Sequence, residues 1–375
     1  MAKLGDICTI YTGTGFPTQY QGETSGDYPF YKVGDISRNV TKGNVYLQEC
    51  DNYISADVAK KIKGTIVPAD TVVFAKIGEA VKLNRRAITS QNCLVDNNAM
   101  GICPNKNKLH LSYFFHYMCN LKLETYAEAT TVPSVKKSII ENLDIPLPPY
   151  EEQEKISTLL DEVSKGILLR KQQLEMLDEL VKSRFIELFG DPVLNQHGWR
   201  KVALEANATL LNGRAYKQDE LLDSGKYPVL RVGNFFSNRG WYYSDLELDD
   251  DKYCDNGDLL YAWSASFGPQ IWNGGKVIYH YHIWKVLVGE AYNKQFLCKL
   301  LEYATESLMG DTHGIAMMHL TKSGMEKTEF IVPPIELQEQ FAAFVKQTDK
   351  SKLAVQNSIA ELEELKKSLM QKYFG

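Results

Sequence analysis

Apolar side chains recur at alternating spacings of four and three residues through the segment 148–190. The positions are Ile156, Leu160, Val163, Ile167, Arg170, Leu174, Leu177, Val181, Arg184 and Leu188, with arginine at two of them. This heptad spacing predicts a long helix whose apolar stripe packs against a partner helix. Prolines at the start, acidic residues in the first turn and Gly190 at the end are typical helix boundaries. At 1.5 Å per residue, about forty residues give a helix of roughly 60 Å.

The segment 333–375 repeats this helix without a gap, because Pro148 recurs as Pro333 and Gly190 as Gly375. The same register gives a second seam of Phe341, Val345, Thr348, Lys352, Val355, Ile359, Leu362, Lys366, Leu369 and Tyr373. Each helix therefore has the other copy as its nearest candidate partner. The polar residues within both seams favour an exposed pair of helices, and an ordinary pair of long core helices is the alternative.

The two segments between these helices predict mixed α+β domains. In residues 1–147, short β-rich runs indicate strands at 7–11, 28–36, 71–77 and 86–89, and an amphipathic pattern indicates a helix at 109–125. Residues 191–332 retrace that order, with sparse identity. The predicted division is 1–147, 148–190, 191–332 and 333–375, that is, two similar globular domains, each followed by one copy of the helix.

Composition sets limits on the class of protein. With 375 residues, 44% hydrophobic and 24% charged, the chain can bury two or three cores. No apolar run is long enough for a membrane span and the start lacks a signal-peptide pattern, so we expect a cytoplasmic protein. The seven cysteines show no CxxC spacing, which argues against a disulfide framework or a zinc site.

Charge gives no strong sign of a nucleic-acid partner. The net charge is −5; residues 1–147 carry 16 basic and 14 acidic side chains, and residues 191–332 carry 14 and 18. Contact with DNA would therefore need local basic patches or a partner that neutralises phosphates.

Motifs with possible chemistry have simpler explanations. Residues 147–150 read Leu-Pro-Pro-Tyr, which lacks the polar first residue of an amino-methyltransferase loop, so a helix entrance is the better interpretation. Residues 274–276, Gly-Gly-Lys, lack the spacing of a phosphate loop and indicate a hairpin. His280 and His282 could begin a metal site, but no third ligand is evident. We therefore expect no catalytic residues, no cofactor-binding residues and no metal site.

Polar and stacking residues on predicted loops are the remaining candidates for a binding site. In the first domain they are Lys76, Lys82, Asn84, Arg85, Arg86, Asn97 and Asn98, near Glu79 and Asp96. In the second domain they are Arg231, Asn234, Arg239, Trp263, Ser264, Ser266, His280, His282 and His313, near Gln270. Arginine and lysine can pair with guanine or phosphate and asparagine with adenine, so both sets are candidates for contact with DNA bases. A solvated loop and a polar surface around a core tryptophan are the alternatives.

Two variable globular domains, each followed by a helix that begins Pro-Pro-x-Glu-x-Gln-Glu, resemble the DNA specificity subunit of type I restriction-modification systems. The motif occupies residues 148–154 and 333–339, and Gly-Asp-Leu-Leu-Tyr-Ala-Trp at 257–263 supports it. The resemblance covers essentially the whole chain. It implies an α+β fold in which two target-recognition domains are separated by an antiparallel pair of coiled-coil helices, with an internal pseudo-twofold repeat.

The resemblance also implies a function and partners. Each domain would read one half of a bipartite site on double-stranded DNA. The helices would act as a spacer and would dock methyltransferase subunits, two in number, with restriction and translocase subunits joining the full complex. Those partners would bind S-adenosylmethionine, ATP and Mg, and no membrane contact is implied. Two alternatives are a catalytic DNA-modifying enzyme and a coiled-coil interaction scaffold without DNA binding.

Overall fold

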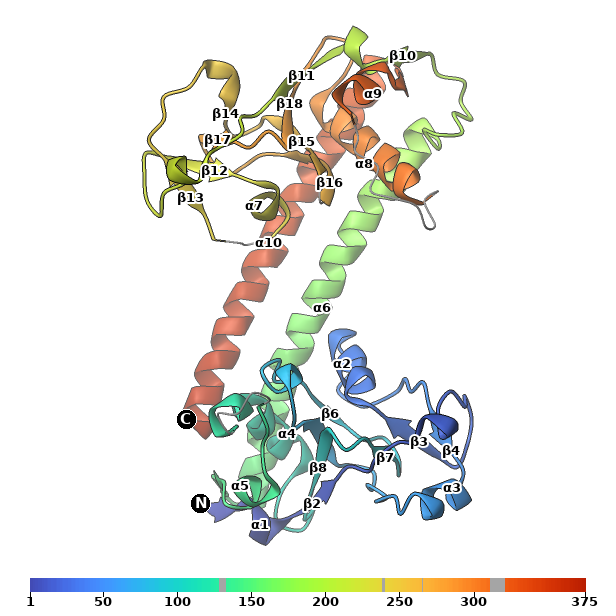
Figure 1. The fold of residues 1–375 in the computed structure, drawn as a ribbon, viewed down its shortest axis with the longest axis vertical. Helices are drawn as coiled ribbons and strands as arrows, with labels where there is room; N and C mark the ends of the chain where they lie inside the picture. The colour runs from blue at the N-terminus through green and yellow to red at the C-terminus, as the bar shows by residue number, and fades with distance from the viewer. Residues whose placement is uncertain (128–132, 238–239, 265, 311–320) are drawn as a thin grey trace. The chain divides into compact units, whose positions relative to one another are not determined.

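The protein divides into two compact units, each of which contains part of both long helices. The computed structural model describes residues 1–127, 133–237, 240–264, 266–310 and 321–375. The first unit comprises residues 1–172 and 356–375, and the second comprises residues 173–355. The helices α6 (Tyr150–Phe189) and α10 (Ile335–Phe374) contain 40 residues each, which confirms the two helices expected from the repeat (Figure 1).

Within the first unit, the start of α6 packs antiparallel to the end of α10. Near the beginning of α6, Ile156 lines the same cleft as Tyr373 from the end of α10. Further along α6, Lys171 Nζ lies 3.1 Å from Glu363 Oε1. From the first contact to the second, the residue number rises along α6, from 156 to 171, and falls along α10, from 373 to 363. The two segments therefore run antiparallel.

The second unit holds the complementary segments of the two helices in the same antiparallel arrangement. Lys352 Nζ of α10 lies 2.6 Å from Asp178 Oδ1 of α6. The Phe185 and Phe341 rings meet edge to face, with ring centroids 5.4 Å apart. Edge-to-face contacts of this kind are a favourable aromatic geometry, and both rings are fully buried here.

Burial along the helices follows the predicted seam closely. The buried seam residues are Ile156, Leu160, Val163, Ile167, Val181, Phe341, Val345, Thr348 and Val355. Arg170 of the predicted seam is instead exposed. Phe185 and Met370 are buried in place of their neighbours Arg184 and Leu369, a shift of one residue in each helix.

The first unit contains two sheets and a short strand pair. Its main sheet is antiparallel, in the order β2 (Cys8–Thr12), β8 (Ala99–Pro104), β5 (Val72–Ala75), β6 (Arg86–Ile88). The second sheet has the order β4 (Tyr53–Ile54), β3 (Tyr28–Tyr31), β7 (Leu94–Val95), with β3 and β7 parallel. The pair is β1 (Ala2–Lys3) with β9 (Asp144–Ile145). The shorter helices are α1 (Leu4–Ile7), α2 (Val33–Thr41), α3 (Ala56–Lys61), α4 (Leu111–Asn120) and α5 (Lys137–Glu141).

The second unit repeats this topology. Its main sheet has the order β11 (Ala208–Asn212), β18 (Ile283–Val288), β15 (Leu259–Ser264), β16 (Ser266–Ile271). The second sheet has the order β13 (Tyr242–Ser244), β12 (Tyr227–Leu230), β17 (Val277–Tyr279), β14 (Tyr253–Cys254), and β12 and β17 are again parallel. The strand pair is β10 (Lys201–Ala203) with β19 (Glu329–Ile331). The shorter helices are α7 (Val232–Phe236), α8 (Lys294–Gly310) and α9 (Lys322–Lys327).

One predicted strand is too long in both units. Residues 28–36 were expected to be a single strand, but β3 ends at Tyr31 and α2 begins at Val33. The cause is a helix cap, because the Asp35 carboxylate accepts a hydrogen bond from the Lys32 backbone N–H at 2.8 Å. In the second unit, β12 likewise gives way to α7 at Val232.

A buried glutamine in each long helix explains the repeated Pro-Pro-x-Glu-x-Gln-Glu motif. The Gln153 amide donates to the carbonyl oxygens of Lys108 (3.1 Å) and Pro148 (2.9 Å), and its Oε1 accepts from the His110 N–H (2.9 Å). These bonds tie the entrance of α6 to the loop before α4. Because a buried backbone group without a partner is costly, the glutamine satisfies three such groups at once.

The second unit has the same arrangement. Gln338 donates to the carbonyl oxygens of Ala291 (3.0 Å) and Pro333 (2.8 Å) and accepts from the Asn293 N–H (2.9 Å). Both glutamines are buried. The motif is therefore a structural element that joins each globular domain to its long helix.

Candidate nucleic-acid interface

The first unit has an exposed polar turn where its two sheets meet. We call residues 96–98, which join β7 to β8, the first polar turn. The Asp96 N–H donates to the Tyr31 carbonyl at 3.0 Å, at the end of β3. The Lys76 N–H donates to the Asn98 carbonyl at 2.8 Å, at the end of β5. The structure thus brings together three predicted site residues, Lys76, Asn97 and Asn98, and leaves both asparagines exposed.

The second unit holds residues 280–282, the second polar turn, with matching backbone bonds. The His280 N–H donates to the Leu230 carbonyl at 2.9 Å, and the Trp263 N–H donates to the His282 carbonyl at 3.0 Å. His280 and His282 therefore occupy the positions of Asp96 and Asn98, and Trp263 occupies that of Lys76. Lys76 and Asn98 of the first predicted set therefore lie on parts of a repeated scaffold that are equivalent to those of Trp263 and His282 in the second set.

A glycine beside each turn permits this backbone contact. The Thr14 N–H bonds to the Val95 carbonyl at 2.8 Å, so the chain at Gly13 runs directly against the first polar turn. A Cβ atom at Gly13 would lie 1.7 Å from the Asp96 carbonyl oxygen, which leaves no room for any side chain. At Gly213, a Cβ atom would lie 2.4 Å from the carbonyl oxygens of the second polar turn and of the residue before it.

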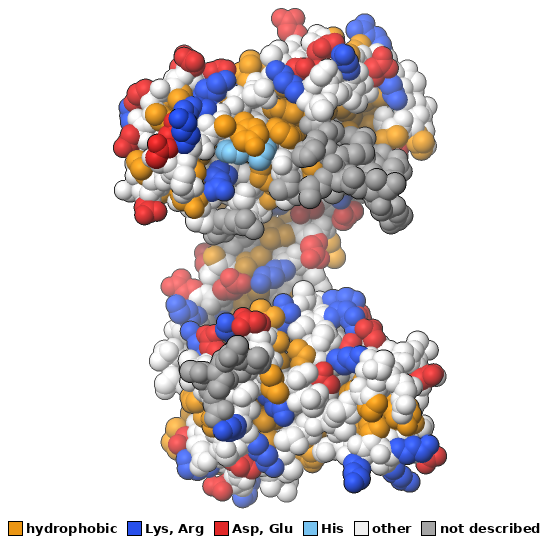
Figure 2. Space-filling view, viewed as in Figure 1, with side chains coloured by type: hydrophobic (Ala, Val, Ile, Leu, Met, Phe, Trp, Pro, Cys, Tyr) orange, Lys and Arg blue, Asp and Glu red, His pale blue; other side chains and the backbone are white. Residues whose placement is uncertain are grey.

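Aromatic rings surround the second polar turn. The Trp263 indole N–H donates to the Tyr281 carbonyl at 2.9 Å, and its ring stacks on Trp284 with centroids 5.7 Å apart. The Tyr281 and His282 rings lie 4.0 Å apart. A cavity of about 570 Å³ beside them is lined by Asn212, Gly213, Trp263, Tyr281, Trp284, Thr321 and Lys322. Figure 2 shows histidine and hydrophobic side chains next to one another on this unit's surface.

The charge of this cluster comes mainly from arginine. Burial, followed by the nearby charges of His282 and Arg231, lowers the pKa of His280 to about 4. A histidine with this pKa is neutral at pH 7, and its Nδ1 accepts a hydrogen bond from the His282 N–H at 3.4 Å. The exposed Arg231 guanidinium lies 5.0 Å above the Tyr242 ring. The cluster therefore offers rings and a neutral imidazole beside the permanent charge of Arg231.

The predicted role of Arg86 in reading bases needs correction. Its side chain is only 4% exposed, in β6, and its guanidinium donates to the Asn84 side chain at 2.7 Å and lies 5.1 Å above the Phe74 ring. Burial lowers the pKa of Arg86 to about 10, which leaves it charged at neutral pH. Arg86 therefore supports the preceding loop from inside. Arg85 and Lys82 remain accessible, and Lys82 pairs with Glu79 at 2.9 Å.

The two neighbouring arginines should respond differently to substitution. We expect Arg86→Ala to lower the free energy of unfolding of the first unit by about 2–3 kcal/mol, because it removes buried contacts and hydrogen bonds. Arg85→Ala should change stability by less than about 0.5 kcal/mol and should weaken binding to one part of a DNA site. Denaturant unfolding measures the change in stability of each variant, and DNA affinity measures the change in binding. Equal weakening on all DNA sequences would instead indicate that Arg85 contacts phosphate.

The remaining predicted residues lie near the second polar turn or outside the described part of the chain. Ser264 and Ser266 face each other across the ends of β15 and β16. Asn234 lies in α7, where its Nδ2 donates to the Gly240 carbonyl at 3.1 Å. Arg239 and His313 lie outside the described residues. Sequence reasoning missed Gly13, Gly213 and Tyr281. The available signal was the likeness of residues 4–13, Leu-Gly-Asp-Ile-Cys-Thr-Ile-Tyr-Thr-Gly, to residues 204–213, Leu-Glu-Ala-Asn-Ala-Thr-Leu-Leu-Asn-Gly, because both segments end at these glycines.

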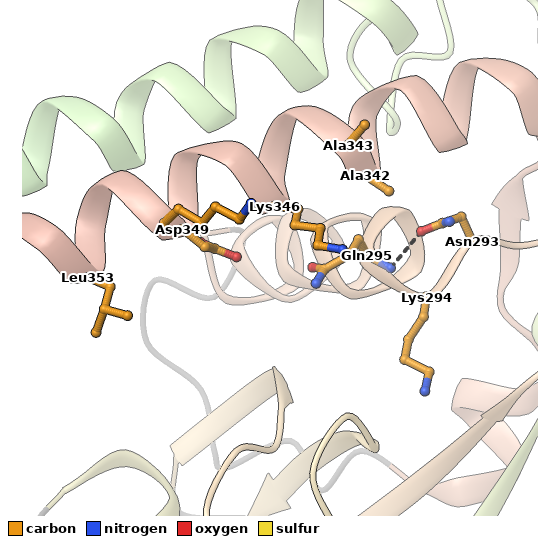
Figure 3. Close-up of a pocket in the computed structure, with 9 residues that line it drawn as sticks. Asn293, Lys294, Gln295, Ala342, Ala343, Lys346, Asp349 and Leu353 are labelled. Atoms are coloured by element: carbon orange, nitrogen blue, oxygen red, sulfur yellow. Dashed lines mark hydrogen bonds between the residues drawn. The ribbon is translucent and has the colours of Figure 1, made fainter.

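A second cavity, of about 660 Å³, lies between α8 and α10 in the second unit (Figure 3). Its lining consists of Asn293, Lys294, Gln295, Ala342, Ala343, Lys346, Asp349, Lys350 and Leu353. The Asn293 side chain accepts a hydrogen bond from the Gln295 N–H at 2.9 Å and so caps α8. The lining contains lysines and one aspartate, and no pairing of a nucleophile with a general base.

The described part of the chain contains neither a metal-ligand cluster nor a helix that could span a membrane. Within it, no group of three or more histidine, cysteine, aspartate or glutamate side chains could hold a metal ion. Among its helices, none combines the length and the apolar character needed to cross a membrane.

Comparison with known proteins identifies the family. The model of the type I restriction modification DNA specificity domain matches residues 1–179 and 196–366. The chain is 25% identical, over 99% of its length and 90% of the relative, to the type I restriction enzyme MjaVIII specificity subunit of Methanocaldococcus jannaschii. The fold also matches two solved structures over the whole chain. One is the S subunit of a type I restriction-modification system from M. genitalium (TM-score 0.58, 13% identity, 95% of that chain). The other comes from a study of complex assembly and conformational transition in the type I R-M system (TM-score 0.60, 18% identity, 96% of that chain). The chain belongs to the family of type I restriction-modification DNA specificity proteins.

Proposed function

We propose that this protein is the specificity subunit of a type I restriction-modification complex and reads a bipartite site on double-stranded DNA, one half with each globular domain. The observation that carries the proposal is the pair of polar turns, which occupy equivalent positions on a repeated scaffold but present different side chains. A repeated scaffold gives both domains the same way of approaching DNA. Different side chains at the same place give each domain its own base preference.

The long helices offer docking surfaces for partners. Leu168 and Leu353 occupy the same position in the two copies of the helix, as do Leu180 and Leu365, and all four side chains are exposed. The first unit contains Leu168 and Leu365, and the second contains Leu353 and Leu180. Exposed leucines at repeated positions mark surfaces that a partner covers. Each unit therefore offers one surface of the same kind, which fits two copies of a methyltransferase subunit.

The chemistry belongs to the partners in this proposal. The specificity subunit is not catalytic, and the methyltransferase subunits bind S-adenosylmethionine and methylate adenine. The restriction subunits, which join the full complex, use ATP and Mg for translocation and cleavage. The site of action is the cytoplasm, where the DNA and these partners are found.

Substitution of the exposed leucines should remove the partners one at a time. We expect Leu168→Asp with Leu365→Asp to leave one methyltransferase subunit per chain, and all four substitutions to leave none and to abolish methylation. Each aspartate would place a carboxylate in an apolar interface, and the cost of burying this charge weakens the docking of the partner. Native mass spectrometry counts the subunits. Leu194→Asp, at an exposed leucine outside both long helices, is the control. A fourfold variant that still carries two partners would show that docking lies elsewhere.

The function itself is tested by co-expression. The chain is purified with and without a methyltransferase subunit, and each sample is assayed for methylation on a library of random DNA duplexes. We expect methylation only in the presence of the partner, confined to duplexes that share a motif in two separated parts. Methylation by the chain alone would reject the non-catalytic role. A continuous motif, or none, would reject the bipartite reading.

A further inference from the structure

We propose that the two polar turns read their half-sites by different chemistry, the first through amide hydrogen bonds and the second through apolar contact with a thymine 5-methyl group. This inference rests on the proposed function, and it adds to that function the chemical feature that each turn recognises. It assigns base contact to Asn97 and Asn98 in the first unit and to Tyr281 and Trp263 in the second.

The equivalence of the turns is fixed by the main chain. In each unit, the last residue of a second-sheet strand, Tyr31 or Leu230, accepts a bond from the first residue of the turn. The third residue of the turn accepts a bond from Lys76, directly after β5, or from Trp263, near the end of β15. The parallel registers agree as well, with Tyr31 opposite Val95 in one unit and Leu230 opposite Tyr279 in the other. The backbone therefore presents the middle residue, Asn97 or Tyr281, in the same way in both domains.

The first turn offers hydrogen-bonding groups. The Asp96 carboxylate accepts bonds from the backbone N–H groups of Asn98 (3.0 Å) and Val33 (3.3 Å), which fixes the shape of the turn. The side chains of Asn97 and Asn98 are exposed beside Lys76. An asparagine amide pairs with the N6 donor and the N7 acceptor of adenine in the major groove. The natural target of this turn is therefore an adenine.

The second turn offers rings in place of amides. The only donor of the Trp263 indole is used on the Tyr281 carbonyl, so its remaining partly exposed surface is apolar. Tyr281, at the tip of the turn, is 39% exposed. Trp284, which pairs with Asn212 in the register where Met100 pairs with Thr12, is buried and stacks against the Trp263 ring, so it supports the exposed rings. The apolar feature of the major groove is the thymine methyl group, so an exposed cluster of rings favours thymine.

The test uses the chain in complex with its methyltransferase subunit. The recognised motif is first selected from a library of random duplexes, and single bases are then replaced in that motif. Uracil in place of thymine removes only the methyl group. 7-Deazaadenine in place of adenine removes only the N7 acceptor. We expect uracil at one position of one half-site to weaken binding about tenfold, and 7-deazaadenine at one position of the other half-site to do the same.

Variants assign each effect to a turn. Tyr281→Ala should abolish the uracil effect and leave the 7-deazaadenine effect. If Tyr281→Ala lowers the melting temperature, the milder Trp263→Phe, which shrinks the apolar surface, should reduce the uracil effect alone. Asn97→Ala with Asn98→Ala should do the reverse. Tyr46→Ala is the matched control, because Tyr46 is 42% exposed and bridges to Ile88 at the opposite end of the first main sheet.

Two failures can be told apart. If the wild-type complex selects no two-part motif, the proposed function itself fails. If it selects such a motif but uracil has no effect at any position, or the variants leave both effects in place, the function stands and the assignment of the turns is overturned. If the half-site that the second unit reads contains no thymine, the assignment of the turns is overturned as well.

Discussion

Alanine in place of Gly213 is expected to abolish recognition of one half-site while the other half-site is still read. The added Cβ atom would lie 2.4 Å from two backbone carbonyl oxygens, at Tyr279 and His280, and backbone atoms cannot move aside as the end of a side chain can. The second polar turn must then separate from β11. Since base contact depends on the position of the turn, we expect at least a hundredfold loss of affinity on that half-site, about 2.7 kcal/mol.

The first unit offers a matched substitution at Gly13 and a control substitution at Gly15. Gly13→Ala should disturb the first polar turn and the other half-site, because its Cβ atom would lie 1.7 Å from the Asp96 carbonyl oxygen. Gly15→Ala serves as the control, since nothing lies within 4 Å of a Cβ atom there. Affinity is measured on duplexes with either half-site scrambled. An equal loss on both half-sites after Gly213→Ala would indicate general unfolding and would count against a positioning role.

Leucine in place of Gln153 should lower the free energy of unfolding of the first unit by about 3–5 kcal/mol, because three buried backbone groups lose their partner. Leucine keeps most of the volume, so the loss reports the hydrogen bonds and not a cavity. Gln338→Leu should have the same effect on the second unit. Denaturant unfolding measures the stability of each unit, and hydrogen exchange at the His110 and Asn293 amides reports the local bond.

The control for both glutamine variants is Gln172→Leu, which lies on the exposed side of α6. We expect it to change stability by less than about 0.5 kcal/mol. If Gln153→Leu were as mild as this control, the repeated motif would have to be explained by partner docking and not by the folding of each domain.

The long helices could be predicted from the sequence because their signal is periodic and occurs twice. The seam was displaced at Phe185 and Met370, since a heptad count cannot tell which of two adjacent residues turns toward the core. The strand at 28–36 was too long for a related reason. The side chain of Asp35 ends that strand by capping a helix, and an apolar pattern carries no sign of a cap.

The candidate site was predictable by residue type but not by exposure. Asn84, Arg85 and Arg86 are consecutive and polar, yet only Arg86 is buried, because it lies in β6 against Phe74 while the other two precede the strand. The equivalence of Lys76 and Trp263 could be predicted, because residues 70–76 and 257–263 match along the chain and end at these two residues. The matching backbone hydrogen bonds of Lys76 and Trp263 confirm it.

The division of the long helices between the units has a consequence for biosynthesis. The core of the first unit includes Met370, and its partly buried neighbours include Phe374, so that core draws on residues 356–375, which follow the whole second unit in sequence. A ribosome makes these residues only after it has made the second domain. The first domain to be translated therefore remains unfinished until the second has been made, and its exposed apolar surface must be protected from aggregation during that interval.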